Sequence, residues 1–260
     1  MIKICFVFKT LIIAKNLAFL FVIMALFYTL KGFHAIMCRI GFRKKEDNLS
    51  LLQELKGLDL WAKVGLRSFI RDGAVFLDEI RKIDGNFKIF LDLKLYDIPY
   101  TMANAALECA KLEIDMLTVH LSSAKSTLTI LMQHLNALKK RPLIMGVSAL
   151  TSFSEEEFLS VYNAPLKTQA IKLSAMGKES GIDGVVCSVF ESLAIKEALG
   201  QGFLTLTPGI RLNKKDKEDQ ERVANAKEAK QNLSDFIVVG RPIYQAKEPR
   251  EVVLELLKDC

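Results

Sequence analysis

Histidine and cysteine are scarce in this chain of 260 residues, and neither is spaced to hold a metal ion. The three histidines are His34, His120 and His134, and the five cysteines are Cys5, Cys38, Cys109, Cys187 and Cys260. The cysteines are odd in number and far apart, without a CxxC motif or a Cys/His ligand pair. This pattern argues against a disulfide framework and structural zinc, and it favours a reducing compartment.

Two further patterns are missing from the sequence. The basic residues do not cluster with aromatic side chains, so we expect no nucleic-acid partner. No GxGxxG motif follows an early strand, which argues against a dinucleotide-binding sheet. The formal charge of +6 is modest and is compatible with a phosphorylated anionic ligand, as it is with many other functions.

The N-terminal segment differs in character from the rest of the chain. The stretch from Leu17 to Leu30 contains fourteen residues without a charge, with Lys15 before it and Lys31 after it. It resembles a signal-peptide core or a short anchor, but a full membrane span needs about 20 apolar residues. We therefore predict a cytoplasmic protein without a membrane partner.

From about residue 45 the chain alternates short apolar runs with helical patterns. The predicted strands are 58–65, 87–95, 115–121, 141–150, 181–188, 203–209 and 235–240, each followed by a helical stretch such as 67–82. Alternation of this kind predicts a parallel sheet with right-handed crossovers. We expect an α/β fold, a (β/α)8 barrel whose first strand is defective or replaced and lies just before residue 45. An open doubly wound sheet is the alternative.

Charged and polar residues stand at the carboxyl ends of these strands, where barrels place their functional groups. They are Lys63, Asp92, Lys94, Asp97, Thr151, Arg211 and Arg241. Asp92 and Lys94 are two residues apart on one strand, so they point to the same face with Phe90. Carboxylates beside Lys94 would keep it protonated and oriented to give a proton to a carbanion. An ion pair on an exposed strand end is the simpler interpretation.

The wider sequence DLKLYDIPYT (92–101) resembles the DxKxxDIPxT signature of orotidine 5′-phosphate decarboxylases. Further segments match that family in order and spacing: WAKVG (61–65), VSALTS (147–152), DGVVCS (183–188), LTPGIR (206–211) and VVGRPI (238–243). The resemblance runs from about residue 46 to the C-terminus. It implies conversion of orotidine 5′-phosphate to UMP and CO2, without a metal or an organic cofactor, in pyrimidine biosynthesis.

The resemblance also implies a role for each matching residue. Lys94 would be the proton donor to C6 of the pyrimidine, with Asp92 near the departing carboxylate. Asp97 would enter the site of a partner subunit, because the family forms homodimers with shared active sites. The implied substrate-binding residues are Lys63, Ile98, Thr101, Thr151, Arg211, Gln220, Gly240 and Arg241.

The first strand departs from the family pattern. The family has an apolar strand that ends in Ala-Leu-Asp, and that Asp binds the ribose, whereas AIMCRIGFRKKED (35–47) has no Asp at the strand end.

A hypothetical DNA that encodes MQLCVALDLEKK gives AIMCRIGFRKK when read two nucleotides later. We hypothesise a frameshift, with 1–43 as an aberrant segment and 44–260 as the decarboxylase barrel domain. Ile36, Cys38 and Ile40 alternate and could replace the strand, with Arg39 and Arg43 near the site. We then expect reduced or absent activity.

Two other functions fit part of the sequence. A barrel decarboxylase that acts on a keto-sugar phosphate shares the DxK pattern but needs Mg²⁺. A membrane-anchored, non-catalytic phosphate-binding barrel would make use of the apolar N-terminus. The DIPYT (97–101) and TPGIR (207–211) segments favour the nucleotide substrate.

Overall fold

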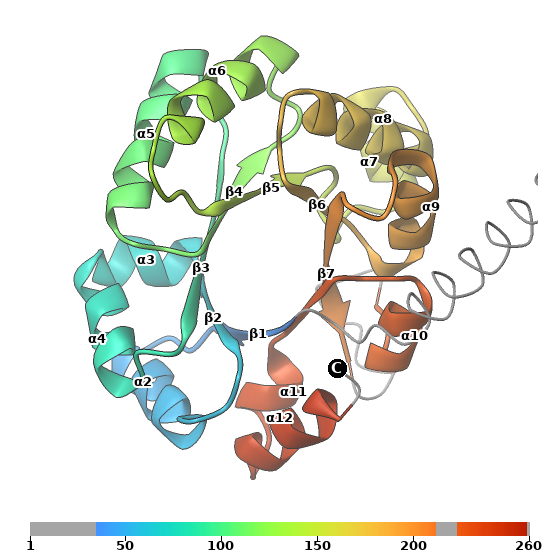
Figure 1. Ribbon diagram of the computed structural model, residues 1–260. Helices are drawn as coiled ribbons and strands as arrows, with labels where there is room; N and C mark the ends of the chain where they lie inside the picture. Colours follow the sequence, from blue (N-terminus) through green and yellow to red (C-terminus); the bar gives the residue numbers. More distant parts are fainter. Residues whose placement is uncertain (1–34, 212–222, 259–260) are drawn as a thin grey trace, which may run out of the picture. The chain divides into compact units, whose positions relative to one another are not determined.

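The computed structural model describes residues 35–211 and 223–258, and these form a closed barrel of eight parallel strands (Figure 1). The strands are β1 (Ala35–Ile40), β2 (Trp61–Gly65), β3 (Lys88–Leu95), β4 (Met116–His120), β5 (Leu143–Val147), β6 (Gly184–Val186), β7 (Leu204–Ile210) and β8 (Phe236–Val239). Each strand pairs with its neighbours in sequence, and β1 pairs with β8. The (β/α)8 prediction is confirmed.

Helices follow the strands and lie outside the barrel (Figure 1). They are α2 (Lys45–Glu54), α3 (Leu66–Asp72), α4 (Val75–Ile83), α5 (Pro99–Lys111), α6 (Lys125–Asn136), α7 (Glu155–Tyr162), α8 (Leu166–Glu179), α9 (Val189–Leu199), α10 (Ala226–Gln231), α11 (Arg241–Tyr244) and α12 (Pro249–Leu257). The prediction of a single helix at 67–82 is wrong. Two helices, α3 and α4, cover this range, and Gly73 separates them with a φ of 66° in the left-handed region.

The first strand is present and is built from the replacement that its alternation predicts. Ile36, Cys38 and Ile40 are buried and pack outward against the helices, whereas Met37 packs inside the barrel. Residues of β1 pair with β2 on one side and with β8 on the other. The barrel therefore has no open edge at this position, and it includes the last residues of the 1–43 segment.

The core has two layers, because the faces of each strand are buried against different partners. Inside the barrel, apolar side chains from several strands pack together: Met37, Phe90, Met116, Met145, Val147, Val186, Leu206, Phe236 and Val238. Between the sheet and the helices lies a larger apolar cluster. Burial on both faces explains why the strands appear in the sequence as short, nearly continuous apolar runs.

A glycine allows close contact between neighbouring strands. A Cβ atom at Gly184 would lie 2.4 Å from the carbonyl oxygen of Leu204, so a side chain cannot fit there without a backbone shift.

Within the described ranges, no helix is long and apolar enough to cross a membrane. The side chains of Cys38, Cys109 and Cys187 are buried.

Candidate active site

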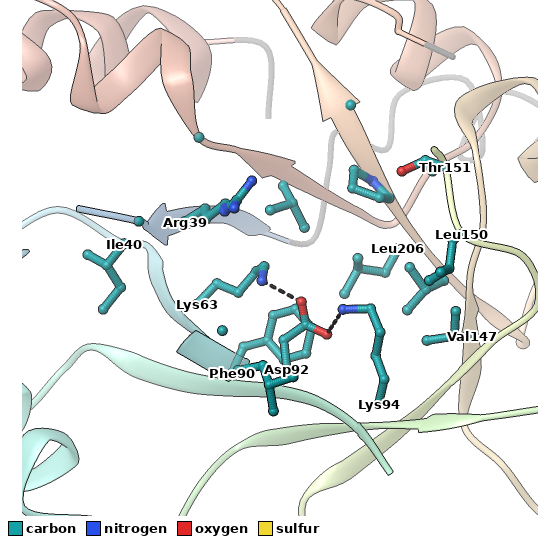
Figure 2. Close-up of a pocket in the computed structure, with 18 of the residues that line it drawn as sticks. Arg39, Ile40, Lys63, Phe90, Asp92, Lys94, Val147, Leu150, Thr151 and Leu206 are labelled. Atoms are coloured by element: carbon teal, nitrogen blue, oxygen red, sulfur yellow. Dashed lines mark hydrogen bonds and ion pairs between the residues drawn. The ribbon is translucent and has the colours of Figure 1, made fainter. Parts of the chain in front are cut away.

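The carboxyl ends of the strands surround a cavity of about 360 Å³ (Figure 2). The charged residues that line it are Arg39, Lys63, Arg67, Asp92, Lys94, Arg211 and Arg241. Apolar side chains, among them Phe90, Val147, Leu150 and Leu206, line the remainder. Six of the seven charged residues are cations, so the field in the cavity favours an anionic ligand with an apolar portion.

Asp92 lies between two lysines at the base of the cavity (Figure 2). Its Oδ1 accepts a hydrogen bond of 2.7 Å from Lys94 Nζ, and its Oδ2 forms an ion pair with Lys63 Nζ. Asp92 and Lys63 are each only 8% exposed, whereas the side chain of Lys94 is 38% exposed. Lys94 is therefore the more accessible of the two lysines, and Lys63, which also lines the cavity, lies on the other side of Asp92.

The two-residue period of β3 explains why these groups meet. Phe90 packs inside the barrel, and Asp92 and Lys94 follow it along the wall of the cavity, as the spacing predicts. Ile89 and Leu91 point to the other face and pack against the helices. Alternation along one strand thus separates the chemistry of the site from the outer core.

The backbone changes conformation at Lys94. Its φ is 52°, in the left-handed region, and the pairing of β3 with β4 shifts register between Leu91 and Leu95. The Lys94 N–H donates a hydrogen bond of 2.9 Å to Thr118 Oγ1, and the Thr118 hydroxyl donates one of 3.0 Å to Asp92 Oδ1. This contact could not be predicted from the sequence, because threonine is common in strands for its shape alone.

The pKa values of the central pair reflect burial and charge. Burial alone would raise the pKa of Asp92, but the ammonium groups of Lys63 and Lys94 reverse this and hold it well below its usual range. Burial lowers the pKa of Lys63, an effect that Asp92 opposes and that the charges of Lys94 and Arg39 reinforce. Asp92 is thus an ionised carboxylate held between two lysines, in a site with limited access to water.

The rest of the cavity wall carries groups that the sequence predicts to bind the substrate. Thr151 follows β5, Arg211 follows β7, and Gly240 and Arg241 follow β8; all four line the cavity. Arg211 is 6% exposed, although its side chain carries a charge. Guanidinium groups suit phosphate because their fork of donors matches its oxygens.

Arg39 of β1 also faces the cavity, as expected for a replaced first strand (Figure 2). Its side chain passes close to the backbone of Gly41 and Gly240. Arg43 is not among the residues that line the cavity. The end of the first strand therefore contributes a cation to the site and no carboxylate.

Three predicted site residues lie elsewhere in the same chain. Asp97, Ile98 and Thr101 are exposed in the segment that joins β3 to α5 and at the start of α5, and none lines the cavity. The Asp97 carboxylate accepts a hydrogen bond from the N–H of Ile98 at 2.7 Å. Gln220 lies outside the described residues.

His120 ends β4 but does not line the cavity. Its ring packs against Tyr96 with centroids 5.5 Å apart, and its Nδ1 accepts a hydrogen bond from Ser122 N–H. Burial, with a smaller effect from Lys94, lowers its pKa. Over 35–211 and 223–258, no three His, Cys, Asp or Glu side chains group as metal ligands.

Comparison with known proteins gives a consistent result. Residues 39–256 match the model of the orotidine 5′-phosphate decarboxylase / HUMPS family. The chain is 95% identical over 221 residues to an orotidine 5′-phosphate decarboxylase of Helicobacter pylori (strain Shi470), which covers 85% of this chain and 97% of the relative. It is 58% identical over 216 residues to that of Campylobacter lari, covering 82% and 95%. The crystal structure of the Lactobacillus acidophilus protein of that name superposes with a TM-score of 0.75 at 32% identity, covering 86% and 98%.

Proposed function

This chain belongs to the orotidine 5′-phosphate decarboxylase / HUMPS family, and on this premise we propose that Lys94 is the proton donor of its reaction. The activity is that of a carboxy-lyase of pyrimidine biosynthesis, which converts orotidine 5′-phosphate to UMP and CO2. One observation carries the assignment of Lys94. It is the accessible ammonium of a buried cluster, hydrogen-bonded to a carboxylate whose pKa is held well below its usual range.

The cluster suits the electronic demands of this reaction. When the bond between C6 and the carboxylate breaks, CO2 leaves and the electron pair remains on C6. An ammonium fixed beside C6 stabilises this charge as it develops and then gives up its proton, leaving UMP and a neutral lysine that regains a proton from water. Asp92 orients the ammonium of Lys94 before the reaction, and Lys63 balances the charge of the carboxylate.

We assign the phosphate to the wall formed by Arg211, Gly240 and Arg241, with Gln220 as a further contact. Thr151 also lines the cavity, and we assign it a contact with the ribose or the base. Phosphate binding at this wall is distant from the bond that breaks, so its energy serves to hold the base against Lys94.

The positions of Asp97, Ile98 and Thr101 support a homodimer with shared sites. All three are exposed and lie outside their own chain's cavity. The same segment exposes three large apolar side chains to solvent: Tyr96 is 64% exposed, Ile98 68% and Tyr100 65%. Apolar groups concentrated on one loop favour contact with another chain, and a second copy would bring Asp97 to the partner's Lys94.

The end of β1, where the family's aspartate binds the ribose, differs in this chain. No carboxylate at the end of β1 lines the cavity, whereas the cation Arg39 does. A guanidinium only donates hydrogen bonds, so it cannot accept them from the ribose hydroxyls as a carboxylate would. We therefore propose that this chain binds the nucleotide more weakly, and turns it over more slowly, than family members with an acidic strand end.

The central test compares the purified chain with its Lys94→Ala form in an assay of orotidine 5′-phosphate decarboxylation. We expect a loss of activity of about 100-fold or more, which is the range for removal of a positioned proton donor. Lys111→Ala is the control, because Lys111 pairs with Glu108 on the exposed face of α5. Equal activity of Lys94→Ala and the unmodified chain would refute the assignment.

A mixing experiment tests the shared site. Lys94→Ala and Asp97→Ala chains are each expected to be inactive alone. If Asp97 acts in the partner's site, each hybrid dimer has one intact site, and refolding the two chains together restores about a quarter of the activity by statistical pairing. No recovery in a mixture shown to contain hybrids contradicts the shared site.

A further inference from the structure

Thr118 connects the two functional residues of β3 although it belongs to the neighbouring strand. It is 0% exposed and lies on β4 between Leu117 and Val119, which pack into the outer core. Its hydroxyl lies 3.0 Å from Asp92 Oδ1, and the N–H of Lys94 lies 2.9 Å from its oxygen. One buried hydroxyl therefore contacts the carboxylate and the backbone of the lysine.

The direction of both hydrogen bonds is fixed by chemistry. A backbone N–H only donates, so Thr118 accepts from Lys94, and an ionised carboxylate only accepts, so Thr118 donates to Asp92. The low pKa of Asp92 keeps its carboxylate ionised. The hydroxyl has one proton, which it donates to Asp92, and its oxygen accepts from the Lys94 N–H. No other arrangement of the hydroxyl satisfies both hydrogen bonds.

The backbone of Lys94 needs this support. A left-handed φ of 52° is unfavourable for a residue with a side chain. The register of β3 against β4 shifts between Leu91 and Leu95, so the regular strand pairing is interrupted around Lys94. The Thr118 side chain replaces the missing backbone acceptor for the Lys94 N–H at this break.

We propose that Thr118 is a positioning residue for the decarboxylation, which holds the Lys94 backbone and the Asp92 carboxylate in one fixed geometry. The inference rests on the proposed role of Lys94 as proton donor. Asp92 Oδ1 receives both Lys94 Nζ at 2.7 Å and the Thr118 hydroxyl at 3.0 Å, so the hydroxyl limits rotation of the carboxylate that orients the ammonium. Small losses of alignment in such an arrangement slow the chemical step more than they weaken binding.

Thr118→Val tests the inference, because valine keeps the shape of the side chain and removes only the hydroxyl. We expect kcat to fall about tenfold or more, as a hydrogen bond to a charged group is lost, with KM nearly unchanged. Thr118→Ser restores the hydroxyl and should recover most of kcat. If Thr118→Val fails to fold, Thr118→Ala removes the hydroxyl without adding bulk and carries the same expectation.

Thr207→Val is the matched control. Thr207 is also a fully buried strand threonine, but its hydroxyl contacts Ser234 and Phe236 and no residue of the Asp92 cluster. It should lose stability while retaining kcat, which separates a loss of stability from a loss of alignment.

The outcomes distinguish this inference from the proposed function. An unchanged kcat in Thr118→Val, together with an inactive Lys94→Ala, overturns the role of Thr118 alone. Equal losses in Thr118→Val and Thr118→Ser also overturn it, because the hydroxyl is then not the group that matters. Full activity of Lys94→Ala overturns the assignment on which both rest.

Discussion

Replacement of Asp92 by asparagine removes the single anion shared by Lys63 and Lys94. The hydrogen bond of 2.7 Å to Lys94 corresponds to a Coulomb energy of about 6 kcal/mol at an effective dielectric of about 20. The cost of burying the charges offsets much of this attraction when the carboxylate is present. When it is absent, Lys63 remains buried at 8% exposure without its counter-charge. We therefore expect Asp92→Asn to lower the free energy of unfolding at pH 7 by about 3 kcal/mol, the low end for a broken buried pair.

The pH dependence of this loss carries the sharper test. Burial lowers the pKa of Lys63, so the unfolded chain takes up its proton more readily than the folded one. The resulting penalty is largest below the folded-state pKa of Lys63, falls as the pH rises, and disappears above the ordinary lysine pKa of about 10.4, where Lys63 is neutral in both states. The difference in stability between Asp92→Asn and the unmodified chain should therefore narrow as the pH approaches that value.

Urea denaturation at pH 7 and at a pH near 10 measures the difference. The fluorescence of the single tryptophan, Trp61, reports on the barrel, since its ring packs against Phe236 of the closing strand. Glu108→Gln is the control: it also converts an acid to an amide, but its pair with Lys111 is about two-thirds exposed, and we expect a loss below about 0.5 kcal/mol. An Asp92→Asn chain as stable as the unmodified one at pH 7, or a difference that does not change with pH, would refute the reasoning.

Three further predictions concern the barrel, the ribose end and metal dependence. Gly184→Ala should lower the free energy of unfolding by about 2 kcal/mol because its Cβ meets the Leu204 carbonyl oxygen, whereas Gly202→Ala, which has open space, should be near neutral in the same thermal denaturation experiment. Gly41→Asp should lower KM about tenfold in the decarboxylation assay by adding a charged acceptor, while Gly41→Asn should not; a Cβ at Gly41 would make ordinary contacts of 3.6 Å with Arg39 and Tyr244. EDTA should leave the reaction rate unchanged, and a rate abolished by EDTA and restored by Mg²⁺ would instead favour the keto-sugar chemistry.

The barrel could be predicted because each buried strand leaves a short apolar run in the sequence. The sixth strand, predicted at 181–188, narrows to Gly184–Val186, since flanking residues leave the ladder. The first strand was harder to predict because its residues lack the family's sequence, although the count of units required it. The helix α11 was missed because four residues are too few to show a helical period.

The site could be predicted only where the information is local. Asp92 and Lys94 share a face because they share a strand, and a period of two suffices to show it. Thr118 meets them through the register of β3 against β4, which depends on the whole sheet and on the irregularity near Lys94. Asp97 does not line the cavity of its own chain, and the role proposed for it depends on a second chain, so the single barrel does not test it.

The pairing of β1 with β8 has a consequence for how the protein is made. Ala35 lies opposite Phe236, about 200 residues later in the chain, so closure requires a contact of very large sequence separation. During synthesis the N-terminal strands emerge first, and β1 has an exposed edge until β8 follows. Gly240 and Arg241, to which we assign the phosphate, come immediately after β8, so on that assignment the nascent chain cannot bind a nucleotide before the ring is nearly closed. A nucleotide that binds only the closed form would then stabilise that form by mass action.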